Sequence, residues 1–457
     1  MSPTKSRINV EEIVDDIQAL LKEGKTEYVR NILVDFHAAD IADLMEHLEP
    51  HQRELVFSLL LPEAASEVLA ELEDAPKEDL LETLDSTRIA ELVTAMDTDD
   101  ATDVVSELST EKAAEVLEQV EEEHSGDIQE LLHYPEDTAG GIMAKEFVAV
   151  NADSTVAEAI EELRRNRDKV EEIYQCYVVD DFGVLVGAVS LKDLLLASPN
   201  TKIREIMDTE VYAIDSNMDQ EEVAYIFQKY DLVSAPVVND RHQVIGRITI
   251  DDIVDVINEE TDEDLARIAG IGEEEILEES LTRIVRARLP WLIVSFIGEI
   301  GSAFIMEYYE VTIGQILASA FFIPLVMAMG GSIGQQTSII VVRGLATGEI
   351  NPGDIVRRLI RDTRVAMING LVIAGLIFLI VLFWQGDAKF GIVLSGTLVV
   401  VMTNAALFGA IIPFGLKKIN VDPAIATGPF VATFNDVVGL TIYFTLLSLA
   451  LKSGLIT

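Results

Sequence analysis

One acidic side chain lies inside an apolar run near the C-terminal end of the chain. Asp436 follows Asn435 in the run from Val421 to Leu451, and the fifteen residues after it carry no charge. In a membrane-spanning helix this carboxylate would lie in the hydrocarbon layer, where an ionisable group is costly unless it faces water, a cation or a bundle interior. The arrangement indicates cation binding, with a protonated or hydrogen-bonded structural aspartate as the alternative.

Other oxygen-bearing residues interrupt two further apolar runs. One contains the sequence from Gly330 to Thr337, including Gln336, and another contains Thr403-Asn404. Their amides and hydroxyls offer oxygen to a polar species at membrane depth, although close helix packing also explains such glycines. Oxygen donors without a Cys or His cluster suit a hard cation such as Mg²⁺.

Five apolar runs are long enough to position these groups as membrane spans: 290–306, 313–342, 365–384, 390–416 and 424–451. Basic residues cluster after the second and fourth runs, and the positive-inside rule places such loops in the cytoplasm. Five spans then leave the C-terminus outside the cell membrane. The basic residues are Arg343, Arg357, Arg358, Arg361, Arg364, Lys417 and Lys418.

Charge divides the chain into two halves. Of its formal net charge of -46, residues 281–457 contribute +3 and residues 1–280 contribute -49. An acidic half of this kind attracts cations and repels nucleic acid, so we expect no nucleic-acid partner. The single cysteine, Cys176, excludes an intrachain disulfide and suits a reducing compartment. No signal peptide precedes this half, so we expect the N-terminus in the cytoplasm.

Residues 1–133 show an apolar period of twelve. A second apolar residue follows each member by four positions, which is the spacing of one helix face. Short helices with this pattern bury their apolar faces by stacking, so the segment predicts an all-α superhelical solenoid. The period runs through Ile32, Leu44, Val56, Val68, Leu80, Leu92, Val104 and Val116, each followed by its partner at Phe36, Leu48, Leu60, Leu72, Leu84, Met96, Leu108 and Val120.

Residues 134–260 contain a duplicated α/β module, with copies at about 134–198 and 199–260. Each copy predicts a strand, a helix, two further strands and a closing helix. Gly187 to Asp193 matches Gly246 to Asp252 at a displacement of 59, and both contain the pattern G-x-x-S/T-x-x-D. This repeated pattern resembles a CBS-domain pair. The resemblance implies a site for an adenosine nucleotide such as ATP, although a turn and helix cap explain the pattern equally well. The implied residues are Ser190, Lys192 and Asp193, with Leu232, Ala235 and Pro236 lining the base.

A polar connector follows at residues 261–289. Its composition predicts a charged helix that enters the membrane, and Arg283, Arg286 and Arg288 mark that side as cytoplasmic. Such a helix could transmit motion of the acidic half to the membrane half, or act as a passive tether.

The order of solenoid, CBS pair, polar connector (plug) helix and five-span α-helical transmembrane domain at 290–457 resembles the MgtE family of magnesium channels. The most specific residues are Asp422-Pro423-Ala424, Gly428 to Thr433 and Asp436 to Gly439. The resemblance implies that Asp436 holds a hydrated Mg²⁺ in the pore of a homodimer, with backbone at Gly428 and Ala432 lining the passage. Ser332 departs from the family pattern, which has an asparagine there.

The same resemblance implies gating by cytoplasmic Mg²⁺ bound to acidic residues of the soluble half. Asp99 and Asp103 are four residues apart, so their like charges would share one helix face and favour a cation between them. The implied regulatory ligands are Glu67, Asp99, Asp103, Asp219, Glu221, Asp231, Asp252, Glu260, Glu263, Asp264 and Asp422.

The leading interpretation is therefore a feedback-gated Mg²⁺ channel in the lipid bilayer of the cell membrane. One alternative is a transporter of another divalent cation, Co²⁺ or Mn²⁺, which oxygen ligands alone do not exclude. Another is a membrane-anchored CBS sensor that conducts no ion. Asp436 argues against it, because a membrane anchor gains nothing from a carboxylate at membrane depth. The sequence contains no P-loop, nucleophile elbow or metal-hydrolase motif, so we do not expect an enzyme.

Overall fold

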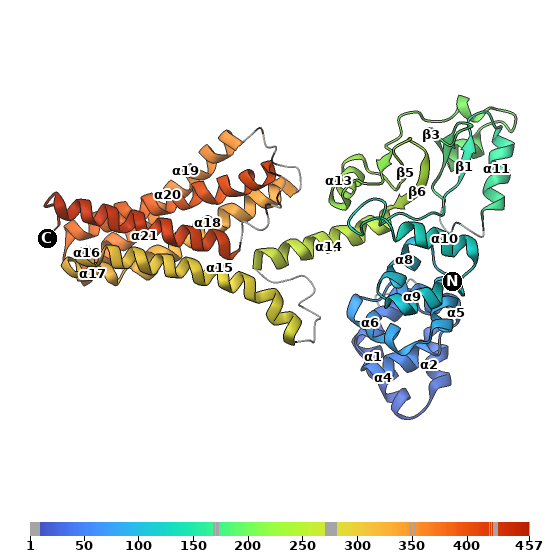
Figure 1. Ribbon diagram of the computed structural model, residues 1–457, viewed down its shortest axis with the longest axis horizontal. Coiled ribbons are helices and arrows are strands. Elements are labelled where there is room, and N and C mark those ends of the chain that lie inside the picture. The colour runs from blue at the N-terminus through green and yellow to red at the C-terminus, as the bar shows by residue number, and fades with distance from the viewer. Residues whose placement is uncertain are drawn as a thin grey trace. The chain divides into compact units, whose positions relative to one another are not determined.

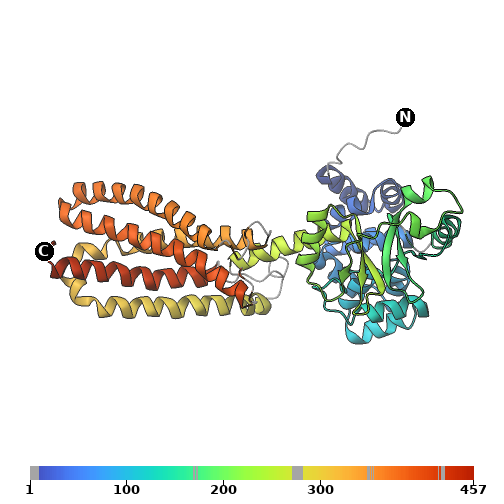
Figure 2. The same ribbon diagram turned by 90° about the horizontal axis from the view of Figure 1, so that it is seen from above.

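The computed structural model describes residues 10–456, apart from 168–169, 171–172, 270–280, 347–349, 351–352, 354, 420, 422 and 424–427. It divides into an N-terminal unit, Met1–Asn258, and a C-terminal unit, Glu259–Thr457. Figures 1 and 2 show two views of the chain, and each unit is described by itself below.

Short helices make up the first part of the N-terminal unit. Helices two apart in the chain pack together, as α3 does with α5, α5 with α7, and α8 with α10, so the array forms the predicted superhelix. The helices are α1 (Val10–Lys22), α2 (Thr26–Leu33), α3 (Ala38–Glu46), α4 (Pro50–Phe57), α5 (Pro62–Ala70), α6 (Asp74–Thr83), α7 (Ser86–Val93), α8 (Thr98–Ser106), α9 (Thr110–Leu117) and α10 (Glu122–Leu131).

The period of twelve residues is the repeat of one helix plus its turn. Val56, Val68 and Leu92 are completely buried in the core of the array, while Ile32 and Phe36 pack at its edge. Proline at the first helical position begins α4 and α5, where its missing N–H costs no hydrogen bond. The sequence prediction of a helical solenoid is therefore confirmed.

Two three-stranded sheets form the second part of this unit. In each sheet the first strand pairs parallel with the second, and the second pairs antiparallel with the third. The elements of the first copy are β1 (Ala149–Asn151), α11 (Val156–Arg165), β2 (Gln175–Val179), β3 (Leu185–Ser190) and α12 (Leu191–Leu196), followed by the 3₁₀ turn η1 (Ile203–Glu205). Those of the second are β4 (Ile214–Asp215), α13 (Gln220–Tyr230), β5 (Ser234–Val238), β6 (Val244–Thr249) and α14 (Ile250–Ala269).

The two copies pair their strands in equivalent registers. Gln175 lies opposite Ser190 in the first sheet, and Ser234 lies opposite Thr249 in the second, which preserves the displacement of 59 residues. The sheets are joined by a hydrogen bond of 2.8 Å between Tyr177 Oη and Ser234 Oγ. The predicted CBS-type duplication is therefore present.

Long helices form the C-terminal unit, and five candidate spans are present among the described residues: Ile284–Tyr308, Leu317–Leu345, Ile355–Trp384, Ala388–Lys418 and Phe430–Lys452. Figure 2 shows the long helices running alongside one another, with α16 and α17 at the end where α21 finishes. The helices are α15 (Leu281–Tyr308), α16 (Glu310–Gln315), α17 (Leu317–Ala320), α18 (Ile323–Ala346), α19 (Ile355–Trp384), α20 (Ala388–Lys418) and α21 (Pro429–Lys452).

The predicted connector is not one described helix. Residues 261–269 continue α14, residues 281–289 begin α15, and the segment 270–280 lies outside the described residues. The first part of the connector thus extends the closing helix of the second CBS copy, because no helix-breaking residue separates Thr249 from Ala269.

Candidate functional site

The carboxylate of Asp436 lies two turns into α21. Gly428 is the N-cap of this helix, and Pro429 occupies its first turn. Proline suits this position because the backbone N–H that it lacks would have no partner within the helix. The carboxylate of Glu299, on α15, is the charged neighbour of the Asp436 carboxylate. Two carboxylates from different spans are therefore neighbours within the bundle.

Small residues set the crossing of α15 and α21 that brings these carboxylates together. A methyl group added at Gly298 would overlap the Cγ2 atom of Thr433, while one at Gly301 would lie 3.6 Å from Val437 Cγ2. Because Gly298 has no side chain, the two helices approach closely on either side of Glu299 and Asp436.

Glu299 was missed by the sequence analysis. It lies in the first apolar run, between Gly298 and Ile300, where the rule that singled out Asp436 applies equally. Its side chain is exposed on the isolated chain, as is most of α15. An acidic residue in a predicted span was the signal that could have found it.

Asn435 faces a different neighbour from Asp436. Its side chain is only 3% exposed and fills the space beside Gly334 of α18, where a methyl group would overlap the amide nitrogen. Neither amide atom has a hydrogen-bond partner among the residues described. Successive residues on a helix point about 100° apart, so Asn435 lies between α18 and α21 while Asp436 meets α15.

The other predicted ion-pathway residues are spread over the unit. Gln336 on α18 is exposed and Asn404 on α20 is half-buried. The Gly428 carbonyl accepts a hydrogen bond of 3.5 Å from the Ala432 amide, closing the first turn of α21. Asp422 lies outside the described residues.

In the N-terminal unit, the start of α8 is fastened to the CBS pair. Thr98 Oγ1 donates to Glu146 Oε2 at 2.7 Å and accepts from the Lys145 amide at 2.8 Å. Nearby, Arg247 Nη2 lies 3.7 Å from Asp97 Oδ2. These contacts hold the acidic first turn of α8 against the start of α14.

Three carboxylates are electrostatic neighbours where these helices meet, although they are not close enough together to form a metal site of three ligands. Burial raises the pKa of Asp99 well above its usual 3.8, and the Asp252 carboxylate raises it further. Desolvation by the surrounding protein, followed by repulsion from Asp252, raises the pKa of Asp100 to about 6, although Asp100 is exposed at the rim of the contact. Burial also raises the pKa of Asp252 to about 6, against hydrogen bonds from Thr249 that favour its charged form. The cluster favours bound protons or a cation.

The structure joins the predicted Asp99 to Asp252 and adds Asp100, which the sequence analysis did not name. It also brings Glu71 on α5 near Asp255 on α14: burial and then the Asp255 charge raise the pKa of Glu71. The predicted Glu67 lies one turn before Glu71 and contributes to the same shift. Acidic residues of two solenoid helices thus face the first turns of α14.

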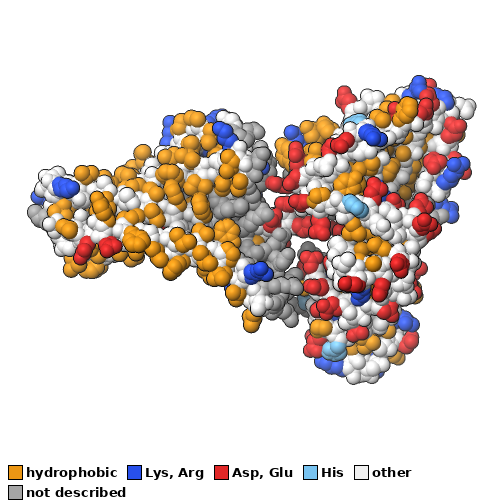
Figure 3. All heavy atoms as spheres, viewed as in Figure 1, with side chains coloured by type: hydrophobic (Ala, Val, Ile, Leu, Met, Phe, Trp, Pro, Cys, Tyr) orange, Lys and Arg blue, Asp and Glu red, His pale blue; other side chains and the backbone are white. Residues whose placement is uncertain are grey.

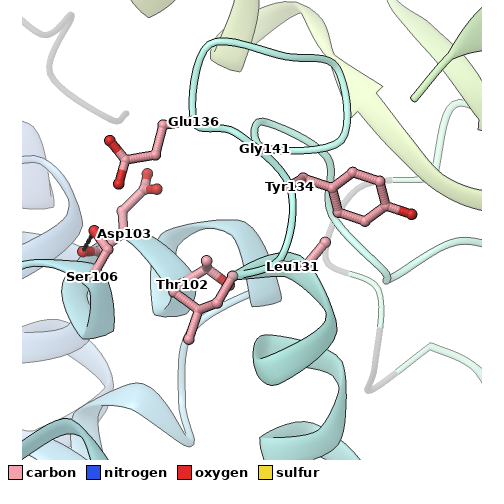
Figure 4. Close-up of a pocket in the computed structure, with 8 residues that line it drawn as sticks. Thr102, Asp103, Ser106, Leu131, Tyr134, Glu136 and Gly141 are labelled. Carbon is pink, nitrogen blue, oxygen red and sulfur yellow. Dashed lines mark hydrogen bonds between the residues drawn. The ribbon is translucent and has the colours of Figure 1, made fainter. Parts of the chain in front are cut away.

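Asp103 lies one turn after Asp99 on α8. It lines a small pocket of about 40 Å³ between α8, α10 and the segment that leads into the first CBS copy. Figure 4 draws the carboxylates of Asp103 and Glu136 on the same side of this pocket. Asp103 thus faces this pocket, while Asp99 has Asp252 as a neighbour.

The remaining predicted ligands have local structural roles or few described contacts. Asp219 caps α13 and accepts from the Glu221 amide at 3.0 Å, and Asp231 ends that helix with a φ of 53°. Glu260 and Glu263 lie on the last turns of α14, and the side chain of Asp264 lies outside the described residues. In the described part of the chain, no three Asp, Glu, His or Cys side chains gather closely enough to hold a metal ion.

The predicted nucleotide residues of the first CBS copy form a helix cap. Ser190 Oγ donates to Asp193 Oδ2 at 2.6 Å and accepts from the Asp193 amide at 3.1 Å. Lys192 is exposed in the same turn. Leu232 is half-buried, whereas Ala235 and Pro236 are buried on β5, with Ala235 in the core of the second copy.

The chain combines membrane-length helices that hold adjacent carboxylates with an acidic unit that contains a CBS pair. These features are typical of membrane proteins that bind or transport cations. Family profiles agree. "Divalent cation transporter" matches residues 323–446, "MgtE intracellular N domain" matches 36–137, and "CBS domain" matches 139–200 and 203–259.

Two full-length relatives share this organisation. A "Magnesium transporter MgtE" of Bacillus subtilis is 34% identical over 95% of this chain and 96% of its own length. A second, from Thermus thermophilus, is 32% identical over 97% of this chain and 99% of its own. The chain belongs to the MgtE family.

Two solved structures resemble the N-terminal part of the chain. A cytosolic domain of the Mg²⁺ channel MgtE in complex with ATP is 34% identical, with a TM-score of 0.51, and the match covers 53% of this chain and 99% of that one. The soluble part of a magnesium transporter is 31% identical, with a TM-score of 0.50, covering 55% and 99%.

Proposed function

We propose that this protein is a magnesium transporter that admits Mg²⁺ through its membrane helices and closes when cytoplasmic Mg²⁺ is high. Family membership supports the transport of Mg²⁺. The observation that carries the pathway is the contact between Asp436 and Glu299 within the membrane-length helices. Mg²⁺ dehydrates reluctantly, so a few carboxylates that bind its water shell suffice for a passage.

The exposure of Glu299 supports a homodimer. Only 6% of the most apolar window of the first span is buried within one chain, and Glu299 lies on that exposed helix. A carboxylate facing lipid is costly. A second copy related by a two-fold axis would cover α15 and bring two Asp436–Glu299 pairs around one path.

Gating is assigned to the acidic residues that face α14. At low Mg²⁺ the carboxylates of Asp99, Asp100 and Asp252 repel one another, which weakens the seating of α8 against α14. A bound Mg²⁺ neutralises them and tightens this contact. Because α14 runs on to Ala269, tightening at its first turns changes the constraint on the helix that leads towards the membrane unit.

ATP is proposed as a second cytoplasmic ligand. A related cytosolic domain was solved in complex with ATP. Here, Ser190, Lys192 and Asp193 supply a hydroxyl, an ammonium and a carboxylate in one turn, a set able to meet a ribose and a phosphate. ATP would bind to the CBS pair and alter the response to Mg²⁺.

The basic loops support a topology in the cell membrane with the N-terminal unit in the cytoplasm and the C-terminus outside. Transport, rather than catalysis, is the activity proposed. A second candidate function is the transport of Co²⁺ or Mn²⁺, which the description "Divalent cation transporter" favours.

Uptake into vesicles that hold the purified full chain tests the proposal. With Mg²⁺ outside and a Mg²⁺-sensitive dye inside, the wild type should take up Mg²⁺ without nucleotide or a counter-ion gradient. Parallel vesicles with Co²⁺ or Mn²⁺ rank the cations. Folded protein that passes no divalent cation in any lipid tested contradicts transport and supports the sensor interpretation.

A further inference from the structure

A stripe of arginines follows the outer face of the first turns of α19. Arg357, Arg361 and Arg364 are spaced by four and three residues, so they share one side of the helix. All three are exposed, and none has an ion-pair partner among the side chains that the structure describes. Arg358 differs, because its Nε donates to Asp362 Oδ2 at 2.8 Å and both side chains are only 13% exposed.

The opposite side of α19 is the packed one. Ile355 and Leu359 contact Phe414 of α20 in a small apolar cluster, and Ala366 is 1% exposed. The arginine stripe therefore points away from the bundle.

The stripe continues into an apolar face. Ile368, Leu371 and Val372 follow on the same side of α19 and are 63%, 59% and 60% exposed. A helix side this apolar and this exposed faces lipid tails in a membrane protein. The arginine stripe continues the same side of α19 towards its first turn, so this side of the helix faces lipid at the stripe as well.

The length of α19 between Arg364 and Trp384 places the arginine stripe at the level of the phospholipid head groups. Arg364 and Trp384 are about 30 Å apart at a rise of 1.5 Å per residue, which equals the thickness of the hydrocarbon layer. Trp384, 64% exposed, then marks the far interface, as tryptophans commonly do. Arg364 lies at the near interface, with Arg361 and Arg357 within about 10 Å beyond it.

Two lysines on the neighbouring helix lie at the same end of the unit as the stripe. The antiparallel packing of α19 and α20 brings Lys417 and Lys418, both exposed, to the same end of the unit. Figure 3 shows Lys and Arg side chains at this end of α19, above a flank that is mostly hydrophobic. One end of the unit therefore carries five exposed bases.

We propose that this surface, defined by Arg357, Arg361, Arg364, Lys417 and Lys418, binds the head groups of anionic phospholipids. Guanidinium groups pair with phosphate in two-pronged hydrogen bonds. Clusters of four or more bases beside a membrane span attract anionic lipid. The bound lipid stabilises the α19–α20 end of the membrane unit and is independent of the cation pathway.

The test measures phospholipid binding to the full chain in nanodiscs of phosphatidylcholine, with a fluorescent phosphatidylglycerol displaced by unlabelled phosphatidylglycerol. The variant Arg357→Gln/Arg361→Gln/Arg364→Gln should weaken phosphatidylglycerol binding by about fivefold for each charge removed. The matched control is Lys389→Gln/Lys452→Gln, which neutralises two exposed bases outside the cluster and should bind as the wild type does.

Equal loss in the control would overturn the proposal, because net charge rather than this surface would then attract the lipid. Unchanged binding by the triple variant would overturn it as well. Should size-exclusion chromatography show that the triple variant misfolds, Arg361→Gln alone must show the loss expected for one charge. The variant Arg357→Lys/Arg361→Lys/Arg364→Lys, which keeps all three charges, must retain binding.

The acidic N-terminal unit is the competing occupant. This alternative is tested in nanodiscs of phosphatidylcholine without anionic lipid, by protease cleavage of the full chain with and without Mg²⁺. If the N-terminal unit binds the arginine stripe, the triple variant should change the effect of Mg²⁺ on cleavage. The lipid proposal predicts no change there, and such a change would count against it.

Discussion

At the scale of single residues, the proposed cation pathway depends on two carboxylates within the membrane-length helices, Asp436 and Glu299. Asp436 was identified from sequence because one charge in an apolar run has few explanations. Glu299 obeys the same rule but was overlooked, and only the structure shows that the two meet. Asn435 was grouped with Asp436 because they are adjacent in the chain. The helix turns them towards different neighbours, which spacing along a sequence does not reveal without knowing the packing.

The close approach at Gly298 yields a prediction at this scale. Gly298→Ala places a methyl group against Thr433 Cγ2 and pushes α15 from α21. We expect Mg²⁺ uptake to fall by up to about a hundredfold, the loss that misplacing a functional group by about 1 Å can cause. Adding Thr433→Ser removes the Cγ2 atom and should restore most of the uptake. Gly375→Ala, where the added methyl meets nothing within 4 Å, is the matched control. Failure of the serine to rescue would show that Gly298 matters for another reason.

At the scale of elements, the short helices were the most predictable part of the fold. Their repeat of twelve residues fixes both helix length and buried face, and the doubled motif fixes the register of the two sheets. The connector was less predictable: its first nine residues continue α14, since polar residues allow a helix to run on as readily as to stop. Which acids face each other across α8 and α14 depends on tertiary packing and was only partly anticipated.

The fastening of α8 can be tested with Thr98→Val. The change removes the hydroxyl that bonds Glu146 and Lys145, and a buried hydrogen bond of this kind contributes about 1 kcal/mol. We expect faster amide hydrogen exchange in α8 and a weaker effect of Mg²⁺ on that exchange. Thr94→Val, which loses only a bond to Ala90 within its own helix, should leave α8 unchanged. Equal effects of both variants would argue against a specific fastening role.

At the scale of the whole molecule, charge is divided between an acidic soluble half and an apolar, slightly basic membrane half. This division was plain from the sequence. The domain boundaries at 133, 198, 260 and 289 stay predictions. The proposed regulation by protons and Mg²⁺ rests on one group of carboxylates, Asp99, Asp100 and Asp252.

The raised pKa values lead to a pH prediction. Asp100 and Asp252 have pKa values of about 6 in the folded unit against 3.8 ordinarily, so the folded state binds more protons between these values. Its stability therefore falls as pH rises through this window. Without Mg²⁺, the protection factors of the amides in α8 and α14 of the full chain, corrected for the intrinsic pH dependence of exchange, should rise several-fold on going from neutral pH to about pH 5.

Saturating Mg²⁺ should replace the protons and flatten this dependence. Asp252→Asn should flatten it without Mg²⁺ and reduce the response to Mg²⁺, whereas Glu111→Gln, on the exposed side of α9, should do neither. A pH response that persists unchanged in Asp252→Asn would show that other carboxylates control the contact.

The measurement that tests the central claim most directly is Mg²⁺ uptake by Asp436→Asn, Glu299→Gln and the double variant in vesicles, with Glu307→Gln as the matched control outside the pair. If the two carboxylates hold one cation together, Asp436→Asn should lower uptake about a hundredfold and Glu299→Gln about tenfold, the size of charged hydrogen-bond losses. The double variant should then be no slower than Asp436→Asn alone, because the pair acts as a unit. Losses that multiply would show that the two residues act separately, and wild-type uptake by Glu299→Gln would contradict its place in the pathway.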